Sequence, residues 1–307
     1  MRLSWCSTRT EGFKLFLSSY ILISLKFFLT GLGNLYSNLD SIINGIIEAD
    51  KQGFDGALMP DHYMWGEEIG HNMENPYDTL ETWTTLTYLA GKTENIHLGT
   101  LVTPLPFRPP GLLAKRLSTL DVLSGGRVLL GTGAGWSKVE FNGYSEWMGA
   151  KKRVDKTIEA LDIIKRLWTE DKVSHDSEFY SMKEAVLDPK PVQKPYPKIL
   201  FGSSGNRMLR LTGREGDICF VPPWQGHRFY EMKEIVLDAA EEADRVDKIE
   251  FMGGIMGAQG SYDASSYLEI IEEAEEKGCT YCNIAFPRET LTKDIEKFAE
   301  DILPSYK

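Results

Sequence analysis

The chain has 307 residues, enough for one large α/β barrel or two smaller domains, and its 42% hydrophobic residues can supply a buried core. Its 34 Lys and Arg are outnumbered by 45 Asp and Glu, which gives a net charge of −11, and its basic run Lys151-Lys152-Arg153 is short. Because an acidic surface repels phosphate backbones, we do not expect nucleic acid as a partner.

The cysteines indicate a reducing compartment. There are four, at Cys6, Cys219, Cys279 and Cys282, too few for a disulfide framework in a chain of this length. Cys279 and Cys282 form a CxxC pair, but no second pair or nearby His completes a zinc set. We therefore interpret these cysteines as structural and predict no metal.

The N-terminal region is the least regular. Residues 13–29 are apolar but interrupted by Lys and Ser, which argues against a membrane-spanning helix, and no convincing signal-cleavage site follows. The best candidate for a first strand, residues 25–30, overlaps this stretch. We predict a cytoplasmic protein without membrane contact, in which residues 1–24 are an appendage of uncertain role and residues 25–307 are one domain. Failure of a protein starting near Ser24 to fold would contradict this division.

Strands and helices are predicted to alternate from residue 25 onward. Residues 34–53 have a helical apolar face with Asn38 as a cap, and residues 54–60 follow as a strand. Asp78, with Glu81 three residues on, predicts a helix start of the capping-box kind, before a strand over 95–103. Two prolines open a helix from Pro109 to Leu123, and Gly125-Gly126 ends it.

The second half continues the alternation. Residues 127–133 are predicted as a strand and residues 151–169 as a helix, after which residues 173–186 form an excursion, a hairpin covering one mouth of the barrel. The remaining predicted strands are 198–203, 218–221, 250–256 and 281–286, and the remaining helices begin at Asn206, His227, Asp263 and Leu291.

This order predicts an α/β fold, a (β/α)₈ TIM barrel with an excursion after the fourth strand-helix unit. A doubly wound open sheet is the alternative, although no Gly-x-Gly-x-x-Gly follows the first strand. In a barrel of this kind the active site lies at the C-terminal ends of the strands.

The predicted strand ends are rich in glycine, aromatic and hydroxyl side chains and poor in acid-base pairs. Only Asp61, His62 and Arg288 are clearly titratable there. We therefore expect a bound cofactor to carry the difficult chemistry, with the protein supplying an apolar pocket for its rings and a binding site for its phosphate. Candidate walls of this pocket are Met59, Met64, Trp65, Trp136 and Trp224.

Several segments together resemble the bacterial luciferase-like superfamily. They are Gly53-Phe54-Asp55-Gly56, Asp61-His62-Tyr63, residues 98–103, residues 123–136, Arg153 with Trp168, and residues 199–205 with Asp217. The resemblance covers about residues 25–303. It implies a TIM barrel that binds FMN or the deazaflavin coenzyme F420.

The resemblance also implies roles for particular residues. His62 matches a histidine that faces the reactive ring and handles a proton or hydride, next to Asp61. The Leu101-Val102 peptide matches a cis bond behind the ring, although base rates alone favour trans. The loop expected to receive the cofactor phosphate comprises Gly202, Ser203, Ser204, Gly205 and Asn206. As a bare motif, such a Gly-Ser turn is more often only a connector.

Gly135 and Trp136 are expected to let the cofactor or substrate approach the fourth strand. Some deazaflavin-using relatives have an acid where Trp136 stands, which argues against a mechanism that needs that acid. Glu140, one turn later, is a candidate to supply a carboxylate instead, although a solvated glutamate is the first expectation.

The function expected first is a monooxygenase that uses reduced FMN and molecular oxygen on a small organic substrate, with a separate flavin reductase as a possible partner. The alternatives are an F420-dependent reductase or dehydrogenase, a non-catalytic flavin-binding barrel, and a phosphate-ester isomerase without a coloured cofactor. The resemblance also implies a homodimer formed through helices near the second to fourth strands.

Overall fold

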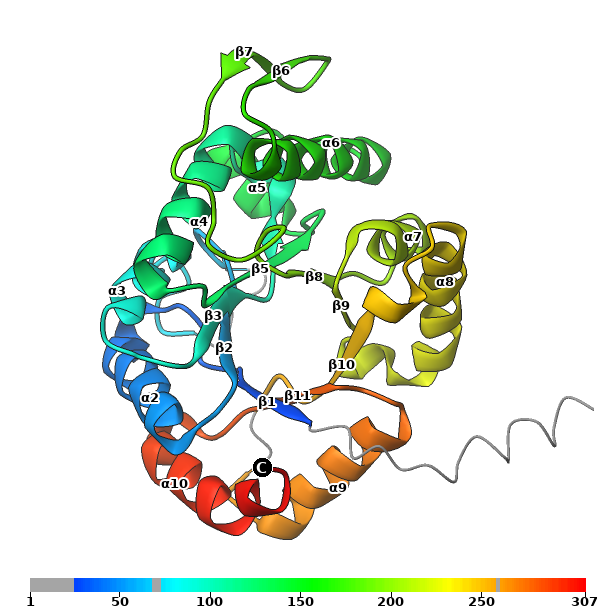
Figure 1. Ribbon diagram of the computed structural model, residues 1–307. Helices are drawn as coiled ribbons and strands as arrows, with labels where there is room; N and C mark the ends of the chain where they lie inside the picture. The colour runs from blue at the N-terminus through cyan, green and yellow to red at the C-terminus, as the bar shows by residue number, and fades with distance from the viewer. Residues whose placement is uncertain (1–24, 68–72, 258–259) are drawn as a thin grey trace, which may run out of the picture.

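The computed structural model describes residues 25–67, 73–257 and 260–307. The expected appendage, residues 1–24, and Cys6 lie outside the described residues. Eight parallel strands form a closed ring with the helices around it (Figure 1), which confirms the (β/α)₈ prediction. In order around the ring the strands are β1 (Lys26–Leu29), β2 (Gly56–Met59), β3 (His97–Thr100), β5 (Val128–Gly133), β8 (Ile199–Gly202), β9 (Ile218–Phe220), β10 (Glu250–Gly254) and β11 (Tyr281–Ile284).

The surrounding helices follow the strands in chain order. They are α2 (Leu39–Gln52), α3 (Thr82–Ala90), α4 (Pro110–Ser124), α5 (Lys138–Tyr144), α6 (Ala150–Thr169), α7 (Asn206–Glu215), α8 (Phe229–Glu242), α9 (Ala264–Glu276) and α10 (Leu291–Asp301). Their starts and ends agree with the predicted signals at most positions. Pro110 opens α4, and Gly125 ends it with φ +68°, a left-handed conformation that glycine adopts without strain.

Side chains along each barrel strand point alternately outward and inward, and this divides the core into two layers. Phe27 points outward and packs edge-on against Phe298 of α10, with ring centroids 5.5 Å apart. Phe28 points inward and packs against Tyr281 of β11 at 5.4 Å. Because successive side chains of a strand point to opposite faces, every barrel strand serves both layers, and the barrel interior is filled.

Two predicted elements differ from the structure, and one observed helix was not predicted. Glu81 is itself the N-cap of α3, accepting the Thr84 N–H at 2.7 Å, so the helix begins at Thr82 and not at Asp78. The strand predicted over 95–103 is interrupted after Thr100 and resumes as the short β4 (Thr103–Pro104). Helix α5 was not predicted, because seven residues give too little periodicity to recognise.

The excursion is a hairpin, as predicted, but it does not cover a mouth of the barrel. Its strands β6 (Val173–Asp176) and β7 (Ser181–Ala185) pair antiparallel and extend outward beyond α6 (Figure 1). His175 pairs with Glu159 of α6 at 2.9 Å, and Lys152 pairs with Glu178 at 2.8 Å. These contacts with an outer helix, which no local sequence pattern reveals, place the hairpin on the outside of the barrel.

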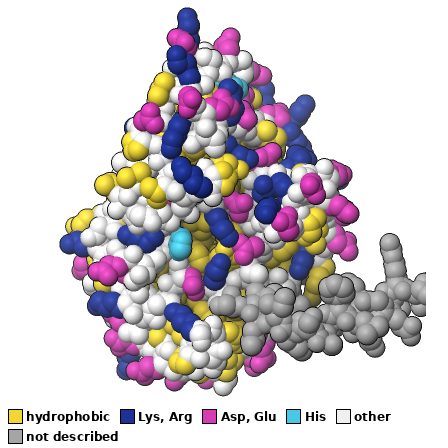
Figure 2. Space-filling view, viewed as in Figure 1, with side chains coloured by type: hydrophobic (Ala, Val, Ile, Leu, Met, Phe, Trp, Pro, Cys, Tyr) yellow, Lys and Arg dark blue, Asp and Glu magenta, His cyan; other side chains and the backbone are white. Residues whose placement is uncertain are grey.

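The surface carries both signs of charge. On the face seen in Figure 2, acidic and basic side chains are interspersed and no continuous basic area is visible. Within residues 25–67, 73–257 and 260–307, no helix is both long and apolar enough to cross a bilayer.

Candidate active site

The predicted site residues come from the C-terminal ends of four neighbouring strands. Asp61 and His62 follow β2, Leu101 and Val102 follow β3, Gly135 and Trp136 follow β5, and Gly202 to Asn206 span the end of β8 and the start of α7. Because these strands are parallel and adjacent in the barrel, all eleven predicted positions lie at the same end of it.

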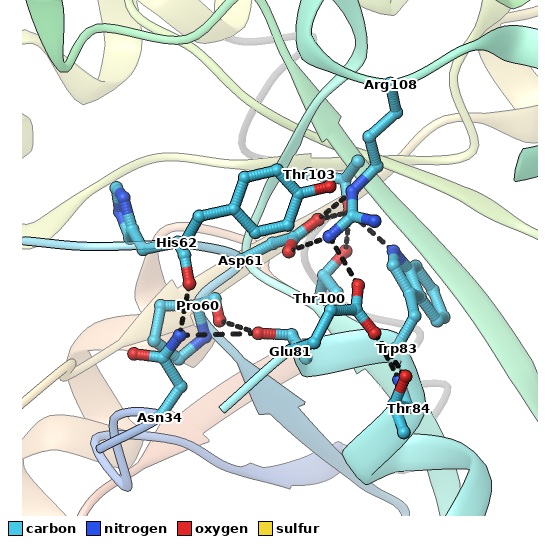
Figure 3. Close-up of polar contacts among 12 residues, drawn as sticks. Asn34, Pro60, Asp61, His62, Glu81, Trp83, Thr84, Thr100, Thr103 and Arg108 are labelled. Carbon is cyan, nitrogen blue, oxygen red and sulfur yellow. Dashed lines mark hydrogen bonds and ion pairs between the residues drawn. The ribbon is translucent and has the colours of Figure 1, made fainter. Parts of the chain in front are cut away.

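Asp61 is buried in an ionic network. Arg108 donates from Nε to Oδ2 at 2.9 Å and from Nη2 to Oδ1, and Thr103 donates to Oδ2 at 2.7 Å. Glu81 at the start of α3 contacts the same guanidinium at 2.8 Å (Figure 3). Burial alone would lower the pKa of Arg108, but the charge and hydrogen bonds of Asp61, together with the charges of Tyr63 and Glu81, outweigh it and raise that pKa. The Asp61 carboxylate is therefore engaged by protein donors.

His62 points the opposite way from Asp61 in Figure 3, as expected for consecutive residues of extended chain. Its carbonyl accepts a hydrogen bond from Asn34 Nδ2 at 2.7 Å. The ring packs against Trp65 at a centroid distance of 4.1 Å and meets Trp136 nearly edge-on at 5.5 Å. Two indoles and one backbone hydrogen bond thus fix the imidazole at the strand end.

Glu140 is not solvated, contrary to the expectation. Its side chain is only 2% exposed, and Oε2 lies 2.9 Å from Nδ1 of His62. Oε1 accepts the backbone N–H of Tyr63 at 2.6 Å. The reason is the unpredicted helix α5, whose N-cap Ser137 begins a turn that brings Glu140 back over the end of β2. A spacing of four residues after Trp136 is the only sequence signal that could have pointed to it.

The peptide bond between Leu101 and Val102 is cis, as the resemblance implies. The Val102 side chain lies over two glycines of neighbouring strands. A β-carbon on Gly133 would come within 2.9 Å of one Val102 methyl, and one on Gly202 within 2.8 Å of the other. Glycine at both positions therefore lets Val102 sit across the top of the barrel.

The loop after β8 leaves space in front of α7. A β-carbon added at Gly205, the N-cap of α7, would meet no atom within 4 Å. Within the described part of the chain, the hydroxyls of Ser203 and Ser204 make no hydrogen bond, and no side chain caps this helix. Free hydroxyls, open space and the exposed N–H groups of a helix start suit a phosphate.

One predicted wall residue and the three buried cysteines belong to the outer layer of the core. Met59 does not line the predicted pocket, because it points outward from β2 into the layer between barrel and helices. Cys219, Cys279 and Cys282 are free and buried, as expected for structural cysteines, and the described residues contain no cluster that could hold a metal ion.

Comparison with known proteins agrees with this geometry. The family model described as luciferase-like monooxygenase matches residues 21–281. The chain belongs to this family.

Individual relatives are similar over part of their length. An F420-dependent glucose-6-phosphate dehydrogenase of Microbacterium testaceum is 35% identical over 168 residues, which is 54% of this chain and 47% of that protein. An FMNH2-dependent dimethylsulfone monooxygenase of Pseudomonas putida is 30% identical over 175 residues, 56% of this chain and 46% of that protein. The matches thus span about half the length of these two curated relatives.

The fold is shared with solved structures at low identity. An F420-dependent secondary alcohol dehydrogenase, solved with an F420-acetone adduct, superposes with a TM-score of 0.77 at 19% identity, covering 92% of this chain and 99% of that one.

Proposed function

We propose that this protein is an oxidoreductase that uses FMN or coenzyme F420 on a small organic substrate, with His62 as the proton-handling residue. The observation that carries the proposal is the imidazole at the end of β2, fixed between Trp65 and Trp136 and backed by a buried carboxylate. A bound flavin or deazaflavin would supply the electron or hydride chemistry, for which protein side chains have no equivalent.

The residues present fit such a cofactor. Val102 and the glycines beneath it offer a smooth apolar support, and the open loop from Gly202 to Asn206 can receive an anionic phosphate at the start of α7. The match of the family model over most of the chain supports the same assignment.

Between the two branches of the family, we propose F420-dependent hydride transfer ahead of the monooxygenase reaction. Trp136 places an indole where some deazaflavin-using relatives have an acid. Glu140 supplies a carboxylate within 2.9 Å of His62, so an acid-base pair is present in the site. The names of the dehydrogenase relatives, which include an enzyme of Segniliparus rotundus aligned over 76% of this chain, support this branch.

Anaerobic titration of the purified protein with FMN and with F420, followed by absorbance, tests the choice of cofactor. Tight binding of F420 with weak binding of FMN supports hydride transfer. The reverse supports the monooxygenase, which would then need a separate flavin reductase. Binding of neither contradicts the proposal and favours the isomerase alternative.

The substitution His62→Asn tests whether the barrel is catalytic. We expect cofactor affinity within about twofold of the native value and a loss of turnover of about a hundredfold or more, the range for a lost general acid or base. Equal turnover in both proteins would favour a non-catalytic flavin-binding barrel.

We also propose a homodimer formed through α3 and α4. Tyr88, Leu112 and Leu123 on these helices are more than half exposed, which leaves apolar side chains for a partner subunit to cover. Light scattering of the native protein and of Leu123→Lys tests this, with dissociation expected in the variant.

A further inference from the structure

We propose that Glu140 is a positioning residue that holds the neutral His62 ring in its Nδ1–H tautomer and so leaves Nε2 as the proton acceptor. The inference rests on the proposed function, in which His62 handles the substrate proton. Its physical basis is the contact between Nδ1 and Oε2, at 2.9 Å, in a region where Glu140 is almost fully buried.

The tautomer follows from what each group can donate. An ionised carboxylate has no proton to give, so both of its oxygens only accept. Oε1 already accepts the backbone N–H of Tyr63 at 2.6 Å, and this donor cannot change its role. When the Glu140 carboxylate faces a neutral ring, the proton between Oε2 and the ring therefore resides on Nδ1.

The contacts around the His62 ring restrict its orientation. Trp65 and Trp136 pack on its sides, and Asn34 fixes the His62 carbonyl. Glu140 itself is held by Ser137, whose hydroxyl accepts the Glu140 N–H at 3.4 Å. Within the described residues, the ring's only hydrogen bond is the one through Nδ1.

This arrangement makes Nε2 a base for alcohol oxidation. When a substrate hydroxyl gives its proton to Nε2, the O–H bond breaks and an Nε2–H bond forms. A bound oxidised deazaflavin would supply the acceptor for the hydride from the same carbon, so that the alcohol would be oxidised and the cofactor reduced. The imidazolium that results is neutralised by the carboxylate 2.9 Å away, and stabilising that charge is the second effect of Glu140.

The isosteric substitution Glu140→Gln separates these roles from packing. The glutamine oxygen must face the Tyr63 N–H, because the amide NH₂ placed there would set two donors against each other. The NH₂ then faces Nδ1, which must become an acceptor, and the ring proton moves to Nε2. The variant should therefore fold normally but present the opposite tautomer.

Two measurements test the inference. In protein labelled with ¹⁵N-histidine, long-range ¹H–¹⁵N correlation spectra at about pH 9 distinguish the tautomers of the neutral rings. The His62 signal is assigned from His62→Asn among the five histidines of the chain. We expect Nδ1–H in the native protein and Nε2–H in Glu140→Gln, with kcat at least about tenfold lower and KM within about twofold.

A matched control exists in the same chain. Glu159 pairs with His175 at 2.9 Å between α6 and the hairpin, outside the barrel. The substitution Glu159→Gln should leave kcat and the His62 signal unchanged. In a His62→Asn background, Glu140→Gln should add no further loss of kcat, because it acts through the missing ring.

An Nε2–H tautomer in the native protein would overturn the inference, and so would Glu140→Gln with native kcat. If Glu140→Gln does not fold, the native spectrum still decides. If no redox turnover is found with either cofactor, the proposed function fails. The spectrum still shows separately whether Glu140 sets the tautomer of the His62 ring.

Discussion

Arg108 grips Asp61 with two donors, Nε to Oδ2 at 2.9 Å and Nη2 to Oδ1, and both side chains are buried beside the end of β2. The pair joins the strand that carries His62 to the segment after β4. It therefore holds the end of β2 in place, on the side of the chain opposite to the His62 imidazole.

Removing one partner of this pair should destabilise the fold. The substitution Arg108→Met leaves the Asp61 carboxylate buried without its counter-charge, which costs about 3 to 5 kcal/mol of the free energy of unfolding. Urea denaturation measures the change. Arg166→Met, which breaks an exposed pair with Glu170 on α6, is the control and should cost less than about 1 kcal/mol. Native stability in Arg108→Met would show that the pair does not support the fold.

The substitution Asp61→Asn tests the role of Asp61, which the sequence suggested as a cofactor-binding residue. Urea denaturation and cofactor titration of this variant are the two measurements. If Asp61→Asn lowers stability and changes cofactor affinity only slightly in the protein that remains folded, the residue supports the site. Loss of affinity at native stability would instead support the prediction that Asp61 binds the cofactor.

Glu81 should contribute stability that depends on pH. Burial alone would raise its pKa, but hydrogen bonds from Thr84 and the charge of Arg108 outweigh it, so the pKa lies below its usual value. A carboxyl group with a lowered folded-state pKa stabilises above its unfolded pKa of about 4.3 and loses that contribution as pH falls through the folded value.

We expect the free energy of unfolding of Glu81→Gln to be about 1 kcal/mol lower than that of the native protein at pH 7. The difference should persist down to about pH 5 and shrink at lower pH. Chemical denaturation across this range measures it. A difference that grows on acidification would mean that the sign of the pKa shift is wrong.

Two glycines near the loop after β8 should respond differently to alanine. In Gly202→Ala the new methyl would lie 2.8 Å from a Val102 methyl, so the top of the barrel must shift, at a cost of about 1 to 3 kcal/mol. Gly205→Ala meets nothing within 4 Å and should leave the fold intact.

If the loop receives the cofactor phosphate, Gly205→Ala should still weaken cofactor binding, because its methyl occupies the open space before α7. Thermal unfolding and cofactor titration of both variants separate the two effects. Native cofactor affinity in Gly205→Ala would argue against a phosphate at this helix start.

The buried cysteines should be unreactive in the folded protein. Burial raises the pKa of Cys219 to about 12 and that of Cys279 to about 11, and it raises the pKa of Cys282 as well. Since the thiolate is the reactive form, none of the three should be labelled by iodoacetamide at about pH 8 unless urea is added. A Cys6→Ser background removes the fourth thiol. Rapid labelling of Cys279 and Cys282 would revive a redox role for the CxxC pair.

Much of the fold could be predicted because local patterns dominate it. Fully apolar strands such as Val128–Leu130, followed by glycine and by helices with apolar faces, are signals that a short stretch of chain carries by itself. Helix α4 begins at Pro110 and is ended by Gly125, and both limits depend only on the backbone chemistry of these two residues. The sequence by itself thus determined the barrel and its strand order.

The tertiary structure decided what the polar residues do. Asp61 and His62 are adjacent in the chain, yet one is bound by Arg108, 47 residues away, and the other by Glu140, 78 residues away. The partner of a buried charge is chosen by distance in space, and no short-range pattern encodes that distance. The direction of the hairpin, set by its contacts with α6, and the burial of Glu140 became visible only once the barrel brought remote segments together.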